Sequence, residues 1–307
     1  MNRTLFFFGV LFIMGAGWGL TSPLSKIAVS TGHGYFGLIV WQLFYSVVIL
    51  GAFSAMRRRG LPLGAPYLLR YALIALTGTV IPNSVSYQTA VHLPAGVMSI
   101  LISLVPMFAL PLALVLGLER FSVSRAFGVI CGAVAIVLLA GPETSLPDPS
   151  VAPWVLIGAI APFMYAVEAN WVAKYGTLDL DPIQLLLGAS VFGLIFVVPL
   201  TLMSGQWIDM TKSWSAPEYA LFLSSAIHAV IYTLYVWLVG KAGSVFASQV
   251  SYIVTATGLL FSMAILGETY SGWIWAALAV MLAGLFLVRP REAEGLVVVP
   301  DPDADAD

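Results

Sequence analysis

Ten long apolar segments fill almost the whole chain, and they restrict its fold more than any other feature. A helix needs about 20 apolar residues to cross the hydrocarbon core of a bilayer. Only 9% of the 307 residues are charged, whereas a soluble domain carries roughly a quarter. Continuous apolar runs favour helices over a barrel. We therefore predict an all-α membrane protein with transmembrane helices at residues 4–29, 35–56, 66–89, 95–117, 123–141, 152–175, 182–204, 217–239, 244–266 and 271–289.

A repeated pattern relates the two halves of the chain. Residues 90–119 and 239–268 each start with small residues, continue as an apolar run and end just after a Leu-Gly step, at Glu119 or Glu268. Five spans per half is an odd number, so the second half enters the membrane from the opposite side. Inverted repeats of this kind are typical of secondary transporters. The pattern predicts two inverted five-helix repeats, residues 1–141 and 152–291.

The distribution of charge predicts the orientation. If the N-terminus is cytoplasmic, all basic residues except Lys26 and Lys212 lie at the inner side. This positive-inside bias predicts that both termini are cytoplasmic. We expect the membrane to be a bacterial inner (plasma) membrane. The connection 142–151 contains Glu143 and Asp148 but no basic residue, as expected for an external linker. Residues 292–307 hold six acidic residues and no base, which predicts a disordered cytoplasmic tail.

Short motifs recur in a fixed order along the chain. The first span carries Trp18-Gly19, followed by Pro23 and Lys26. The fourth contains Leu-Val-Pro-Met-Phe at 104–108 and closes with Leu-Gly-Leu-Glu-Arg at 116–120, and the ninth closes with Leu-Gly-Glu at 266–268. Together these motifs resemble those of the drug/metabolite transporter superfamily and, within it, the EamA-like transporters of ten spans.

The resemblance extends over residues 4–289 and implies transport of amino acids, other small metabolites or drugs. It also implies that central helices line a cavity while the others support them. Two positions depart from the family pattern: Leu118 is inserted in the first Leu-Gly-Glu ending, and Thr255 stands where Pro106 matches the family's proline in the first repeat. The second departure argues against equivalent movement of the two halves.

Glu168 is the only acidic residue well inside a predicted span. Tyr165 and Trp171 lie three residues before and after it, so the three share one helical face. Ionisable groups inside hydrocarbon tend to face a cavity or a partner. One interpretation is a cation or proton site; the other is a structural pair with a neighbouring helix.

The eighth predicted span carries a polar and aromatic stripe made of Ser225, His228, Tyr232 and Tyr235. A histidine facing lipid would be unsatisfied, so the stripe is expected to face inward. It either lines a cavity or joins neighbouring helices by hydrogen bonds.

Other spans carry shorter polar rows, which are either cavity-lining or ordinary interhelical contacts. Lys26 either binds a substrate carboxylate near an outer gate or extends to lipid headgroups.

Proline interrupts several of these helices and predicts hinges. The rows are Trp18 and Ser22 in the first span, Asn83 and Tyr87 in the third, and Gln249, Tyr252 and Thr255 in the ninth; the hinge candidates are Pro23, Pro82, Pro106, Pro111 and Pro162.

We predict a secondary transporter, an exporter by the resemblance, that moves amino acids or related small amphipathic metabolites by alternating access. Proton-coupled efflux of drugs is the alternative. A membrane enzyme would need a catalytic pair, for which only Glu168 and His228 are available, and a receptor would need larger loops. The expected partners are a small-molecule substrate, the lipid bilayer and, under the coupling interpretation, protons. No nucleic acid, cofactor or metal is expected, and the chain is predicted to be a monomer or a weak homodimer.

Overall fold

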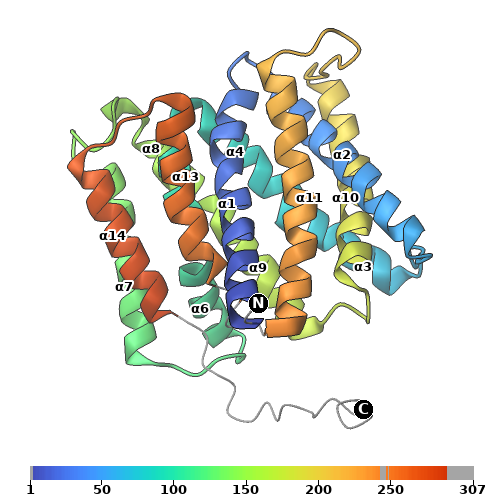
Figure 1. Cartoon of the computed structure of the whole chain (residues 1–307), viewed down its shortest axis with the longest axis horizontal. Coiled ribbons are helices and arrows are strands. Elements are labelled where there is room, and N and C mark those ends of the chain that lie inside the picture. The colour runs from blue at the N-terminus through green and yellow to red at the C-terminus, as the bar shows by residue number, and fades with distance from the viewer. Residues whose placement is uncertain (1–2, 243–246, 248, 289–307) are drawn as a thin grey trace.

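The computed structural model describes residues 3–242, 247 and 249–288, and within these residues every regular element is a helix (Figure 1). The predicted acidic tail at 292–307 and the last residues of the second repeat, 289–291, lie outside the described residues. The helices stand roughly side by side, and α1 begins at the end of the bundle drawn at the bottom of Figure 1. We call this the Arg3 end and the opposite one the Ala28 end.

The helices of the first half follow the predicted spans closely. Two of the spans are divided: the third into two α-helices around a π-helical turn, and the fourth into two short helices. The elements are α1 (Arg3–Ala28), α2 (Tyr35–Met56), α3 (Ala65–Ala75), η1 (Leu76–Val80), α4 (Ile81–His92), α5 (Ala95–Ile102), α6 (Val105–Val115) and α7 (Val123–Ala140).

The second half contains one divided span, the sixth. The elements are η2 (Pro149–Val151), α8 (Pro153–Gly158), α9 (Ile160–Tyr175), α10 (Pro182–Met203), α11 (Ala216–Ala242), α13 (Val250–Leu266) and α14 (Gly272–Leu287). Asp181 begins α10 with a capping box, in which its carboxylate accepts from the backbone N–H groups of Ile183 and Gln184. Arg57 and Arg59 pair with the same carboxylate and so hold the start of α10 against the end of α2.

The divisions within spans occur next to prolines. Proline lacks a backbone N–H, and its ring clashes with the carbonyl four residues earlier, so a helix tends to break just before it. The junctions before Pro82, Pro106 and Pro162 all follow this rule. Pro23 and Pro111, the other two hinge candidates, lie within continuous α1 and α6.

Seven helices or joined helices of the described part are long and apolar enough to cross a membrane, and they match the first seven predicted spans. The remaining three predictions are met less fully. Helices α13 and α14 are apolar but only 17 and 16 residues long. Helix α11 has 27 residues but is more polar, with Glu218, His228 and Lys241. The structure therefore supports a multi-pass helical membrane protein, with seven clear candidate spans among the described residues; the start of the predicted ninth span, residues 244–246 and 248, lies outside them.

The packing of the helices explains which faces are exposed. Helix α1 lies between α11 and α13, while α7 pairs with α14 at one edge of the bundle and α2 with α10 at the other (Figure 1). Large apolar side chains remain exposed on the outside; Val115 is 86% and Met203 85% accessible. Apolar surface of this kind, spread over many helices, is unfavourable in water and suits contact with lipid.

Candidate functional site

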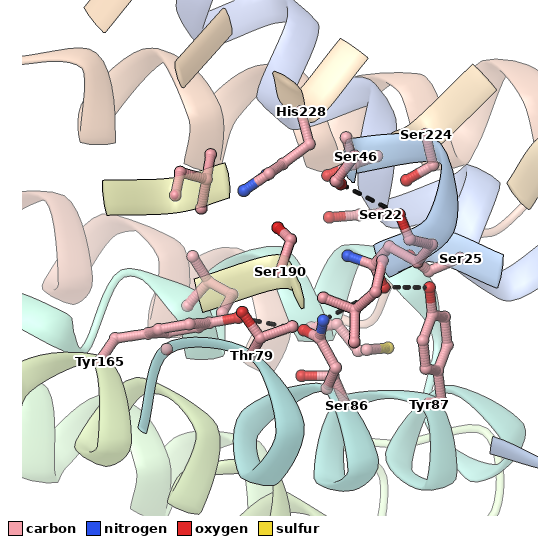
Figure 2. Close-up of a pocket in the computed structure, with 18 residues that line it drawn as sticks. Ser22, Ser25, Ser46, Thr79, Ser86, Tyr87, Tyr165, Ser190, Ser224 and His228 are labelled. Atoms are coloured by element: carbon pink, nitrogen blue, oxygen red, sulfur yellow. Dashed lines mark hydrogen bonds between the residues drawn. The ribbon is translucent and has the colours of Figure 1, made fainter. Parts of the chain in front are cut away.

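A cavity of about 140 Å³ lies in the middle of the bundle, enclosed by helices from both halves (Figure 2). Most of its lining side chains are hydroxyls or amides, and none of them is Asp, Glu, Lys or Arg. We call it the central cavity. Its lining residues are Thr21, Ser22, Ser25, Gln42, Leu43, Ser46, Gly78, Thr79, Asn83, Ser86, Tyr87, Met98, Ile102, Tyr165, Leu186, Ser190, Ser224 and His228.

A chain of hydrogen bonds crosses one wall of the central cavity. Tyr165 donates to the side-chain oxygen of Asn83 at 3.3 Å, and Asn83 donates to Gln42 Oε1 at 3.1 Å. Tyr87 donates to the same Gln42 oxygen at 2.8 Å. The amide nitrogen of Gln42 donates to no acceptor among the described residues, so it is available as a donor. The chain therefore orients a polar group of the cavity wall through contacts among α2, α4 and α9.

Other polar groups of the cavity are uncommitted. Within the described part of the chain, no hydrogen bond engages the side chains of Thr79, Ser190 or Ser224, which Figure 2 shows around the cavity. His228 likewise has no hydrogen-bond partner there and makes only ring contacts. Buried polar groups are normally satisfied by protein, water or ligand. The cavity thus offers donors and acceptors to a hydrated or hydrogen-bonding solute.

Glu168 lies immediately behind the cavity wall. The nearest atoms to the space that a Cβ would fill at Gly78 are the carboxyl atoms of Glu168, so only glycine allows this approach. Gly78 itself lines the cavity and belongs to the π-helical turn η1. Single π-helical turns within α-helices occur frequently at functional sites. Glu168 is partly accessible and accepts no hydrogen bond from the described residues.

An aromatic group adjoins the central cavity on the α1 and α11 side. The ring of Trp18 lies 6.3 Å from His228 and 5.5 Å from Tyr235, and His228 stacks with Tyr232 at 6.3 Å. Only His228 of this group lines the cavity. The imidazole of His228 thus has ring contacts with α1, through Trp18, and within α11, through Tyr232.

The structure brings some of the sequence-predicted site residues together and separates others. Ser22, Asn83, Tyr87, Tyr165 and His228 line the central cavity, and Glu168, Trp18, Tyr232 and Tyr235 lie next to it or behind its lining. Four predicted residues lie elsewhere. Gln249 and Tyr252 line a second cavity at the Arg3 end, Thr255 is buried against Ser103, and Trp171 packs against Tyr175.

Several lining residues were missed by sequence reasoning, chiefly Gln42, Ser46 and Ser190. They lie on α2 and α10, which are otherwise strongly apolar. A signal was present, because Gln42 and Ser46 are four residues apart on one helical face. A single polar row on an apolar helix is a weak indication, and only the packing of α2 against α10 and α4 gives it meaning.

Lys26 and Glu268 close the Ala28 end of the bundle. Lys26 Nζ donates to the carbonyls of Ala90 and Leu93 at 2.6 and 2.9 Å, at the C-terminus of α4. Glu268 accepts from the backbone N–H groups of Ala95 and Gly96 at 2.8 and 3.2 Å, at the N-terminus of α5. Each charge complements the dipole of the helix end it caps. Lys26 therefore has a partner that neither sequence interpretation named, the end of α4.

The residues that correspond to Lys26 and Glu268 in the other halves of the chain, Lys174 and Glu119, make different contacts. Glu119 pairs with Arg125 at 2.8 Å, and Lys174 lies over the ring of Tyr175 at 5.7 Å. The second cavity lies near this pair, at the Arg3 end. The two ends of the bundle thus differ, with charged caps at the Ala28 end and an open cavity at the Arg3 end.

Comparison with known proteins gives the family. The model of the EamA-like transporter family matches residues 6–141 and again residues 152–289. The chain belongs to the EamA-like transporter family. This EamA-like protein is therefore an integral membrane transporter of a small molecule within the drug/metabolite transporter superfamily, and the family indicates transport rather than catalysis.

Its relatives share the length of the chain at low identity. A protein of Escherichia coli (strain K12), "Uncharacterized inner membrane transporter YedA", is 25% identical over 92% of this chain and 90% of its own. A "Probable terminal-alkyne amino-acid exporter" of Streptantibioticus cattleyicolor is 24% identical over 89% of this chain and 90% of its own. A WAT1-related chloroplastic protein of Arabidopsis thaliana is 24% identical over 89% of this chain and 66% of its own.

A solved structure supports the fold. A protein described only as "Crystal structure of protein" aligns with a TM-score of 0.62 and 16% identity, over 91% of this chain and 96% of that one. At this identity the likeness concerns the fold alone.

Proposed function

We propose that this EamA-like protein is a secondary transporter that exports amino acids or related small polar metabolites by alternating access. The observation that carries the proposal is the central cavity, lined by hydroxyl, amide and imidazole groups from both halves. A zwitterionic solute has groups that donate and groups that accept, and this lining offers partners for both. The relative named as an amino-acid exporter favours the same class of substrate and the same direction.

The size of the cavity favours a small metabolite over a drug. Pockets for drug-sized ligands measure about 300–1,000 Å³ and are mainly apolar. The central cavity measures about 140 Å³ and is mainly polar. Drug efflux would need the cavity to expand and to present another lining.

Helix contacts support two inverted five-helix repeats at residues 1–141 and 152–291. A two-fold relation pairs each helix with its counterpart, as in the contacts of α2 with α10 and of α7 with α14. It also relates the contacts of α1 with α11 and α13 to those of α9 with α4 and α6. Substrate sites of inverted-repeat transporters lie between the repeats, where the central cavity lies.

The orientation with cytoplasmic termini would put the Ala28 end outside. The caps by Lys26 and Glu268 would then hold the outer end closed, while the cavity at the Arg3 end would open inward. Alternating access requires these caps to release as the outer end opens. Glu168 is proposed to carry a proton, since it lies beside the cavity with no charged partner among the described lining residues.

Flux in proteoliposomes tests the proposal. We expect purified protein to exchange small amino acids, and an imposed pH gradient to drive net flux. Glu168→Gln should reduce the driven flux and preserve exchange, because glutamine keeps the shape but cannot ionise. Glu143→Gln, in the exposed connection between the halves, is the matched control. Absence of amino-acid exchange by the wild type would reject the substrate class, and a fully active Glu168→Gln would reject the proton role.

A further inference from the structure

The cavity at the Arg3 end differs from the central one in size, lining and charge. It measures about 490 Å³ and shares no lining residue with the central cavity. Most of its lining residues are small or apolar, among them Ala109 and Ala113 of α6 and Leu285 of α14. Glu119 and Arg125 supply its charged groups. A pocket that is mostly apolar with a few convergent polar groups is the usual form of a site for an amphipathic ligand.

Arg125 is the unusual member of this lining. It is only 7% exposed, and its Nη1 donates to Glu119 at 2.8 Å. Its Nε is buried and has no hydrogen-bond partner among the described residues. A guanidinium presents two edges that match a carboxylate, and the edge formed by Nε and Nη2 has no protein acceptor among the residues the structure describes. A buried donor without a partner is costly, so this edge is suited to an anion from outside the chain.

We propose that this cavity is a second binding site, which takes a soluble monocarboxylate with an apolar tail. The carboxylate binds side-on to the Nε and Nη2 edge of Arg125, in the bidentate geometry that arginine favours. The apolar tail lies along Ala109, Ala113 and Leu285. Glu119 stays on Nη1 and holds the guanidinium in place, so one negative charge orients the arginine and a second one binds it. The site does not depend on the proposed function, because its test measures binding and not transport.

Equilibrium binding of a defined probe tests the site. The probe is 4-phenylbutanoate, measured by calorimetry on the full chain in phosphatidylcholine nanodiscs, with 4-phenylbutanol as the neutral analogue. We expect the acid to bind and Arg125→Lys to weaken its binding by about tenfold or more, because lysine keeps the ion pair with Glu119 but has no bidentate edge. Arg120→Lys is the matched control, since Arg120 is exposed and does not line the cavity.

A second variant guards against a folding defect. Ala113→Phe fills the cavity and leaves Arg125 unchanged, so it should abolish binding of the acid while Gln42→Ala in the central cavity does not. Equal binding of acid and alcohol, or unchanged affinity in Arg125→Lys, would overturn the proposal. Loss of acid binding when phosphatidylglycerol is added to the nanodiscs would assign the site to a lipid headgroup instead.

Discussion

Replacing Gly78 by alanine tests the relation between the π-helical turn and Glu168. The new methyl group would occupy the position of the Glu168 carboxyl atoms, two of which lie only 2.6 and 2.7 Å from the ideal Cβ position. These atoms are the far end of a flexible side chain, so the carboxylate moves and the helices stay in place. We expect the variant to keep its fold while the Glu168 carboxylate moves away from its position beside the cavity.

Two opposing free-energy contributions set the effect of Gly78→Ala on stability and on driven flux. Alanine favours a helix over glycine by about 1 kcal/mol, whereas forcing a side chain off its rotamer costs about 0.5–1.5 kcal/mol. The thermal midpoint should therefore change little. The rotamer cost applies only to the conformation in which the Glu168 carboxylate lies beside Gly78, so it lowers the population of that conformation by about 2- to 13-fold. If Glu168 carries the proton, flux driven by a pH gradient falls by this factor, and exchange falls less.

The assay compares driven flux and exchange in proteoliposomes for Gly78→Ala and Gly51→Ala. Gly51 lies in α2, and outside its own stretch of helix no atom of the described residues lies within 4 Å of its Cβ position, so its replacement should be neutral. In a Glu168→Ala background Gly78→Ala should have no further effect, because nothing remains to displace. Additive losses in this cycle, or equal losses at Gly51 and Gly78, would refute the reasoning.

Three further predictions concern other contacts. Lys26→Met leaves carbonyls at the end of α4 without their donor, so it should lower the free energy of unfolding by about 1–3 kcal/mol. The loss should appear as a lower thermal midpoint in detergent, and an unchanged midpoint would contradict the capping role. Gln42→Leu removes the acceptor of Asn83 and Tyr87 and should weaken substrate binding by about tenfold. An unaltered dissociation constant would show that this row of hydrogen bonds does not contribute to substrate binding. Partial burial opposes ionisation of Asp181, but backbone hydrogen bonds and nearby arginines lower its pKa. Its stabilising effect is therefore present above the unfolded-state pKa of about 4 and lost as pH falls through the lower folded value. Asp181→Asn should reduce the loss of unfolding free energy as the pH falls below about 4. Identical plots of unfolding free energy against pH for the variant and the wild type would contradict this prediction.

Sequence reasoning predicted the first seven spans well, and it named some of the residues that line the central cavity. Apolar runs set the positions of the helices because backbone groups in lipid must be satisfied within the helix. Prolines likewise predicted the breaks before Pro82, Pro106 and Pro162. The cavity was harder, because a polar residue on an apolar helix looks the same whether it meets a cavity, as Gln42 does, or a neighbouring helix, as Thr255 does.

The sequence by itself determined the class of protein, the positions of its helices and its family resemblance. These follow from local properties: hydropathy, proline chemistry and the order of short motifs. Only the tertiary structure decided that Glu168 rests against Gly78, that Lys26 caps α4 and that Arg125 lines a cavity with its Nε unpaired among the described residues. The first two contacts join helices far apart in the chain, and the cavity that Arg125 lines is formed by helices from both halves. Their geometry depends on how the helices pack, which no periodicity within a single helix can specify.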